Sequence, residues 1–178
     1  MTGESRTRRL FFALWPDDAV RDALAHATRK AARASGGRPV PVENLHSTLA
    51  FLGAQPEARL ALAVSAAAQL KEPAFRLVLD RLEHWPKQAV LCATCTDAPP
   101  TAGGLAAELW KLLAPQGFAH DSKPYRPHVT LARKVVKPHA RGGMHAVEWP
   151  VDEFALVESV TLPEGAHYSV LQRWPLVC

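Results

Sequence analysis

The feature that most constrains this chain is a short pattern, histidine-x-threonine-leucine, that occurs twice. It lies at His46 in "ENLHSTLAFLG" and at His128 in "RPHVTLAR", 82 residues apart in a chain of 178. The chain has eight histidines. With roughly 5% Thr and 10% Leu, two of them would share the pattern by chance on the order of once in a thousand sequences. The repeat therefore indicates a fold that uses the same segment in two equivalent places.

Both patterns lie in apolar runs typical of β-strands, in which side chains two residues apart point to the same face. His46 and Thr48 are therefore expected side by side, about 6.5 to 7 Å apart along the strand. His128 and Thr130 should stand in the same way, whereas alternate residues such as Phe51 should point into the core. If the two strands face each other, two imidazoles and two hydroxyls converge on one anion site with two proton carriers.

Strand and helix signals alternate along the chain. Strands are expected at "RLFFALW", "HSTLAFL", "FRLVLDRLEHW", "AVLCATC", "HVTLAR", "DEFALVESVTL" and "HYSVLQRW". Helices are expected from Pro16-Asp17-Asp18 to about Ser35, from about Pro56 to Leu70, and over "GGLAAELWKLLAPQG". The Gly-, His- and Lys-rich stretch after "HVTLAR" is expected to be a loop.

This order of elements, with hairpins near the end of each half, predicts an α+β fold built on antiparallel sheets. The two patterns are separated by nearly half the chain, and each follows a long helix. We therefore expect two pseudo-symmetric lobes with flanking helices around a central cleft, each contributing one pattern. No linker divides them, so residues 1–178 are expected to form a single bilobal domain.

The composition is that of a folded, basic protein. Hydrophobic residues make up 48% and charged residues 21%, and the net charge of +4 suits a polyanionic partner such as RNA. The first apolar run meets Pro16-Asp17-Asp18 after about six residues, which is too short for a signal peptide or a membrane span. We expect a cytoplasmic protein with no membrane partner.

The cysteines do not indicate a metal or redox site. Cys92 and Cys95 form a C-x-x-C, but a spacing of three sends side chains of a strand to opposite faces, and no second pair completes a zinc site. No H-E-x-x-H spacing is present. We therefore expect no metal and no cofactor, and we interpret the cysteines as small buried apolar residues.

Together with "RLFFAL", "FRLVLDRLEHWP" and "DEFALVESV", the two patterns resemble the 2H phosphoesterase superfamily, in particular its bacterial RNA 2′,3′-cyclic phosphodiesterases, also called 2′–5′ RNA ligases. The resemblance covers nearly the whole chain in the expected order. It implies the two-lobed 2H phosphoesterase fold and the metal-free hydrolysis of an RNA terminal 2′,3′-cyclic phosphate to a 2′-phosphomonoester. The partners would be RNA 3′ ends or nucleoside 2′,3′-cyclic phosphates, bound by a monomer.

The same resemblance implies roles for individual residues. His46 matches the proton donor to the 3′ oxygen, and His128 matches the base that activates water. Thr48 and Thr130 would donate hydrogen bonds to the non-bridging phosphate oxygens. Arg133 matches a further phosphate contact. Its spacing of five from His128 would point it to the opposite face of a regular strand, so this role needs a bend or a strand end.

The start "RLFFAL" could supply an aromatic side chain that stacks on the RNA base. Phe11 and Phe12 point to opposite faces of a strand, so only one of them can line the cleft. We predict that it is Phe12, against the alternative that both belong to the core.

Two alternative functions remain open at this point. The same histidines, working in reverse, could act mainly as a 2′–5′ RNA ligase that joins a cyclic phosphate to a 5′-hydroxyl. The chain could also be a non-catalytic module that only binds RNA ends.

Overall fold

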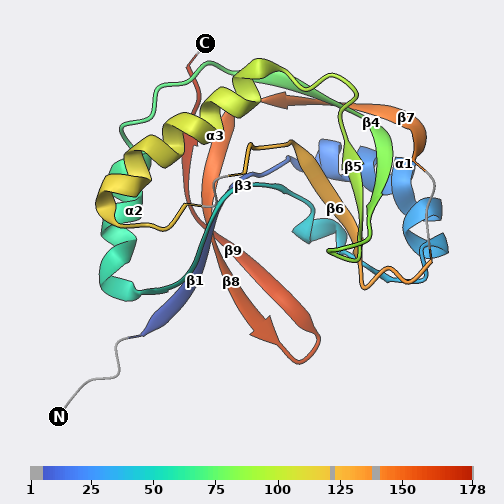
Figure 1. Ribbon diagram of the computed structural model, residues 1–178, viewed down its shortest axis with the longest axis horizontal. Coiled ribbons are helices and arrows are strands. Elements are labelled where there is room, and N and C mark those ends of the chain that lie inside the picture. The colour runs from blue at the N-terminus through green and yellow to red at the C-terminus, as the bar shows by residue number, and fades with distance from the viewer. Residues whose placement is uncertain (1–5, 121–122, 138–140, 178) are drawn as a thin grey trace.

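Two antiparallel β-sheets form the framework of the protein (Figure 1). The computed structural model describes residues 6–120, 123–137 and 141–177. The four-stranded sheet has the order β3-β1-β8-β9 and consists of β1 (Thr7–Leu14), β3 (Ser47–Pro56), β8 (Glu153–Leu162) and β9 (Gly165–Pro175). The five-stranded sheet has the order β2-β6-β5-β4-β7 and consists of β2 (Arg38–Pro39), β4 (Phe75–Trp85), β5 (Val90–Thr94), β6 (His128–Arg133) and β7 (Gly142–Val151).

Each sheet carries one of the two histidine patterns. β3 begins directly after His46, and β6 begins at His128. The prediction that the two patterns come from two lobes of antiparallel sheet is therefore confirmed.

The helices cross from one sheet to the other. α1 (Asp18–Ala34) follows β1 of the four-stranded sheet but packs against β2, β6 and β7 of the five-stranded sheet. α3 (Pro100–Leu113) follows β5 of the five-stranded sheet and packs against α2 (Leu60–Ala67) and against β3. Three short 3₁₀ helices complete the described elements: η1 (Val42–Asn44), η2 (Glu57–Arg59) and η3 (Ala114–Gln116).

Local signals explain the limits of α1. The Asp17 side chain accepts a hydrogen bond from the backbone N–H of Val20 at 2.8 Å, which caps the first turn. Ser35 ends the helix, and Gly36 follows with φ +69°, a backbone conformation that favours glycine. The predicted helix from the acidic start to about Ser35 is confirmed.

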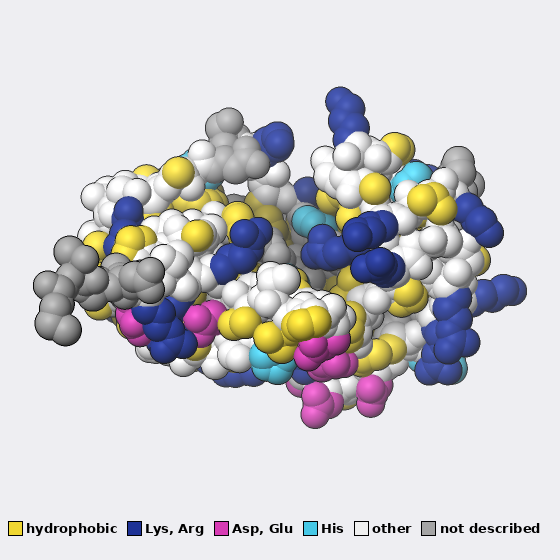
Figure 2. All heavy atoms as spheres, turned by 90° about the horizontal axis from the view of Figure 1, so that it is seen from below, with side chains coloured by type: hydrophobic (Ala, Val, Ile, Leu, Met, Phe, Trp, Pro, Cys, Tyr) yellow, Lys and Arg dark blue, Asp and Glu magenta, His cyan; other side chains and the backbone are white. Residues whose placement is uncertain are grey.

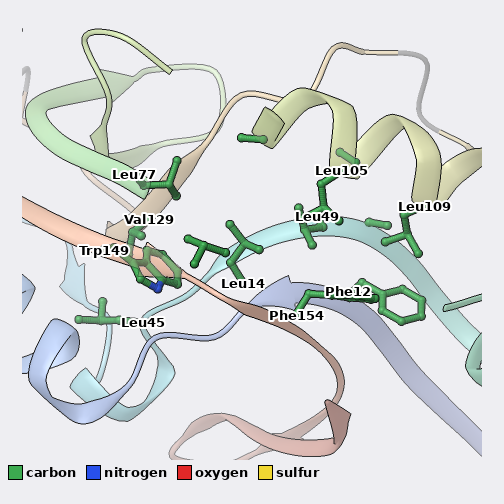
Figure 3. Close-up of a cluster of buried hydrophobic side chains, with 14 of the residues drawn as sticks. Phe12, Leu14, Leu45, Leu49, Leu77, Leu105, Leu109, Val129, Trp149 and Phe154 are labelled. Carbon is green, nitrogen blue, oxygen red and sulfur yellow. The ribbon is translucent and has the colours of Figure 1, made fainter. Parts of the chain in front are cut away.

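One hydrophobic core joins the two sheets. It takes side chains from both sheets and from all three α-helices. Figure 3 shows part of this cluster, including Phe12 and Phe154 of the four-stranded sheet, Leu105 and Leu109 of α3, and Leu77, Val129 and Trp149 of the five-stranded sheet.

The predicted loop after "HVTLAR" was partly wrong, because it contains β7. This strand pairs with β4 at the edge of the five-stranded sheet. Its first residues are mostly exposed and rich in Gly and His, and alternating burial begins only at Val147 and continues at Trp149 and Val151. Pairing with β4, rather than local composition, makes the first half of the segment a strand.

We propose that residues 1–178 form a single bilobal domain, because the core and the crossed helices tie the sheets together. Unfolding in denaturant should give one transition with the same midpoint by far-UV circular dichroism and by tryptophan fluorescence. Trp149 and Trp174 report on different sheets, so the variants Trp149→Phe and Trp174→Phe should each retain a single coincident transition. Two separated transitions would show that the lobes unfold independently.

Candidate active site

The two motif strands meet at a buried serine. The backbone N–H of His128 donates to the Ser47 hydroxyl at 3.4 Å, and a hydrogen bond of 2.8 Å joins that hydroxyl to the hydroxyl of Tyr125. Ser47 is completely buried. Because His46 directly precedes Ser47, this contact brings both histidines to one cleft. Figure 2 shows the molecule hollowed between its two halves, with a histidine in the hollow and Lys and Arg side chains around it.

Both catalytic candidates present the same ring nitrogen to the cleft. Nδ1 of His46 lies 2.7 Å from the Asn44 carbonyl oxygen, and Nδ1 of His128 lies 2.8 Å from that of Arg126. A carbonyl only accepts, so each Nδ1 carries a hydrogen and each Nε2 is left to exchange protons. Nε2 of His46 lies 3.0 Å from the Thr48 hydroxyl, which donates to it while the ring is neutral.

Aromatic rings surround His46, and one aromatic ring contacts His128. Trp15 stacks on His46 with ring centroids 5.5 Å apart, Phe11 lies at 5.0 Å, and Tyr168 meets the ring edge-on at 5.3 Å. The ring of His128 lies 4.6 Å from that of Trp85.

This burial sets the protonation of the two rings, because a low-dielectric surrounding disfavours the charged form. Burial lowers the pKa of His46 to about 4, although the bond to the Asn44 carbonyl opposes the shift, and the positive charges of Arg133 and His128 lower it further. Burial also lowers the pKa of His128, against the effect of its bond to the Arg126 carbonyl. Both rings are therefore neutral in the empty cleft at neutral pH.

A β-bulge turns Arg133 to the cleft face, despite its spacing of five residues from His128. In the pairing of β5 with β6, Cys92 faces Thr130 and Leu91 faces Ala132, so Leu131 is an extra residue. The extra residue shifts the alternation, and Arg133 comes to the cleft face. The bend that the sequence argument required is this bulge.

The same bulge occurs in the first motif. Ala13 faces Thr48 and Phe12 faces Ala50, so Leu49 is extra. As a result Phe51 does not point into the core as predicted: its side chain is 49% exposed and lines the cleft. Phe51 and Arg133 both stand five residues after their histidines, and a superposition of "HSTLAF" on "HVTLAR" would have indicated this.

Three adjoining hollows make up the cleft. His46 and Thr48 line one, together with Arg133. Thr130 lines a second, to which His46 and Arg133 also contribute. His128 lines a third, which adjoins the first at Phe51. The structure thus brings all five predicted phosphate-site residues to the cleft.

The prediction that Phe12 stacks on a base was wrong. Its side chain is completely buried, and its ring packs against those of Phe154 at 6.2 Å and Trp174 at 5.9 Å. Phe11 points to the opposite face of β1 and lines the cleft beside His46. The sequence could not tell the two faces apart, because the residues are identical and adjacent.

Neither the two cysteines nor any other described group forms a recognisable metal site. Cys92 is buried in β5, where burial raises the pKa of its thiol to about 12, and Cys95 is partly buried just beyond the strand. Among the described residues, no group of three or more His, Cys, Asp or Glu side chains is arranged to hold a metal ion. Within the same part of the chain, no helix has both the length and the apolar composition to span a bilayer.

Comparison with known proteins gives a consistent picture. A model of the 2'-5' RNA ligase superfamily matches residues 16–161. The chain is 35% identical to the RNA 2',3'-cyclic phosphodiesterase of Thermus thermophilus, over 94% of this chain and 90% of the relative. It is 32% identical to the protein of that name from Escherichia coli, over 97% of this chain and 98% of the relative. The crystal structure of E. coli LigT complexed with 3'-AMP aligns with a TM-score of 0.88 and 30% identity, over 96% of this chain and 99% of that one.

The fold is that of the 2H phosphoesterases. Within them, the chain belongs to the 2'-5' RNA ligase superfamily, which confirms the resemblance seen in the sequence.

The burial of His46 leads to a testable pH dependence. In NMR spectra of the free protein, the His46 ring should stay neutral as the pH falls through the ordinary value of 6.5 and should titrate near 4. Inorganic phosphate should raise this pKa, because an anion in the cleft favours the charged ring. The variant His46→Gln identifies the signal, and Phe11→Ala, which admits water, should move the pKa back toward 6.5. Titration of the wild-type ring at its ordinary pH would contradict this account.

Proposed function

We propose that this protein hydrolyses the 2′,3′-cyclic phosphate at the 3′ end of RNA, or of a nucleoside, to a 2′-phosphomonoester. The observation that carries the proposal is the convergence of two histidines, one from each sheet, with the same nitrogen turned to one cleft. The relatives named RNA 2',3'-cyclic phosphodiesterase support the choice of substrate.

In this mechanism the phosphate lies between the two rings. His128 takes a proton from water, which attacks phosphorus on one side, and His46 gives a proton to the 3′ oxygen that leaves on the opposite side. The hydroxyls of Thr48 and Thr130 and the guanidinium of Arg133 hold the non-bridging oxygens, whose negative charge must be stabilised through the transition state.

The lowered pKa values fit this division of roles. His128 must be neutral to act as a base, and burial keeps it so. His46 must be protonated to act as an acid, and the negative charge of the bound phosphodiester raises its pKa at that moment. The substrate thus promotes the protonation of its own acid.

The terminal nucleoside then lies on the His46 side, because its 3′ oxygen receives the proton from His46. The exposed ring there belongs to Phe51, with the guanidinium of Arg9 4.8 Å from its centroid. Phe51 replaces Phe12 as the residue proposed to stack on the terminal base.

We further propose that the protein acts as a monomer in the cytoplasm. The two histidines, the two threonines and Arg133 all come from one chain, so the site needs no second copy. A molecular mass near 19.4 kDa by light scattering, with activity retained, would agree with this.

The deciding experiment is incubation of the protein with RNA that ends in a 2′,3′-cyclic phosphate, in excess EDTA, with the product identified by ³¹P NMR. A 2′-phosphomonoester is expected. A 3′-phosphate would reverse the leaving group, and activity restored only by a divalent cation would contradict a metal-free mechanism. Binding of the RNA end without turnover of any cyclic phosphate would favour the non-catalytic module.

Removal of either histidine should lower turnover by about 10²–10⁴, the usual effect of one positioned acid or base. The double variant should lose less than the product of the single losses, because the two groups act together. His46→Ala and His128→Ala are compared with His26→Ala, an exposed histidine of α1 outside the cleft. Thermal melts establish that each variant is folded.

A nitrophenyl phosphodiester separates the two roles, because its leaving group needs little protonation. On this substrate His46→Ala should recover most of its activity and His128→Ala should not. Rescue of His128→Ala instead would exchange the donor and the acceptor.

A further inference from the structure

A carboxylate lies buried beneath the cleft, on the side of His128. Glu83 of β4 is only 3% exposed, although an ionised side chain is costly to remove from water. Glu83 faces Cys92 of β5 across the ladder, and Cys92 in turn faces Thr130 of β6. Because facing residues of paired strands point to the same side, Glu83 lies on the same face of the sheet as Thr130. The mechanism described above gives this carboxylate no role.

Three partners surround the Glu83 carboxylate. One oxygen accepts a hydrogen bond from the Arg126 guanidinium at 2.6 Å, and the other accepts one from Nε1 of Trp85 at 3.1 Å. The Arg141 guanidinium lies 3.5 Å from the second oxygen. Although burial acts to raise the pKa of Glu83, these hydrogen bonds and positive charges keep it below its usual range. The carboxylate is therefore ionised at neutral pH.

Two of these partners also contact His128. The centroid of the Trp85 ring lies 4.6 Å from that of the His128 ring, and the backbone carbonyl oxygen of Arg126 lies 2.8 Å from Nδ1 of the same ring. The Arg126 guanidinium lies 5.5 Å from the centroid of the Trp85 ring, so the two partners also contact each other. The carboxylate and these two partners thus form one connected set of contacts against one side of His128.

The carbonyl that holds the His128 ring depends on a side-chain contact. Residues 124–127 precede β6 without regular secondary structure, and Pro127 has no N–H with which to donate a hydrogen bond. The Arg126 side chain is half exposed, and its hydrogen bond to Glu83 ties it to β4. The place of the carbonyl is therefore set by this tie as well as by the strand that follows.

We propose that Glu83 is a positioning residue for the base: it holds both of these contacts of the His128 ring, and so keeps the hydrogen on Nδ1 and leaves Nε2 to take the proton of the attacking water. This inference rests on the proposed function. The charge of Glu83 acts in the same sense. Burial lowers the pKa of His128, and the positive charges of Arg126 and Arg133 lower it further. A negative charge nearby opposes this shift, and so preserves the strength of the base.

The variant Glu83→Gln breaks one of the two contacts and keeps the other. The amide oxygen of glutamine can still accept from Trp85, whereas its NH2 group would meet the Arg126 guanidinium donor to donor. Turnover should fall by about 10- to 100-fold, the effect of a misplaced catalytic group, with a smaller change in KM. The loss should persist on the nitrophenyl phosphodiester, because that substrate still needs the base. The matched control is Glu148→Gln, which breaks an exposed ion pair with Arg76 in the same sheet.

A spectroscopic signature separates positioning from stabilisation of the fold. In ¹⁵N NMR spectra of the free protein at neutral pH, the wild-type His128 ring should carry its hydrogen on Nδ1, and Glu83→Gln should show a mixture of both tautomers. A loss of stability alone would lower the melting temperature and leave the tautomer of the folded protein unchanged. Arg126→Met breaks the same contact from its half-exposed end and should give the same mixture, so it decides the matter where Glu83→Gln does not fold.

A double variant tests whether Glu83 acts through Arg126. If it does, Glu83→Gln should cost little further turnover once Arg126→Met is present. The double variant should then lose less than the product of the two single losses, whereas independent contributions multiply.

The outcomes separate this inference from the proposed function. Mixed tautomers together with lower turnover, in Glu83→Gln or in Arg126→Met, support the positioning role. A ring that keeps its hydrogen on Nδ1 in the folded variants, normal turnover, or single losses that multiply overturns this role and leaves the proposed hydrolysis standing. Absence of hydrolysis by the wild-type protein overturns the proposed function itself, and with it the role of His128 as a base.

Discussion

The cleft depends on the contact between β3 and β6 at Ser47. These strands belong to different sheets and share no ladder of hydrogen bonds, since β3 pairs with β1 while β6 pairs with β2 and β5. Each histidine ring is held locally by a backbone carbonyl two residues earlier. The distance across the cleft is therefore set by the packing of the sheets and by the buried hydroxyl that joins them, which brings two histidines 82 residues apart in sequence to one cleft.

The same packing gives the site its chemical character. Aromatic rings around His46 reduce its solvation, which favours the neutral ring and makes its protonated form a stronger acid than an ordinary imidazolium. An anionic ligand compensates for the lost solvation, whereas a neutral ligand of the same shape does not. In the proposed function, the burial of His46 therefore favours an anionic substrate in addition to the contacts from the threonines and Arg133.

Sequence reasoning was strongest where one local pattern fixes a local structure. Period-two alternation and the repeated motif were enough to predict the paired strands, the two lobes and the convergence of both His-x-Thr pairs on one cleft. Arg133 came from the family resemblance, because alternation alone points it to the opposite face. It failed where the answer depends on a distant partner. The bulge at Leu131 exists through pairing with β5, the start of β7 through pairing with β4, and the choice between Phe11 and Phe12 through which face of β1 meets the core.

The repeated bulge has a consequence for the polarity of the reaction. A cleft with two identical halves would accept a cyclic phosphate equally well in either of two orientations related by its pseudo-two-fold axis, and the roles of the two histidines would be interchangeable. The bulges bring the fifth residue after each histidine to equivalent places, and there the halves differ: a flat apolar ring at Phe51 and a positive charge at Arg133. Together with the different aromatic surroundings of the two histidines, this pair of side chains makes the two ends of a nearly symmetric cleft chemically distinct.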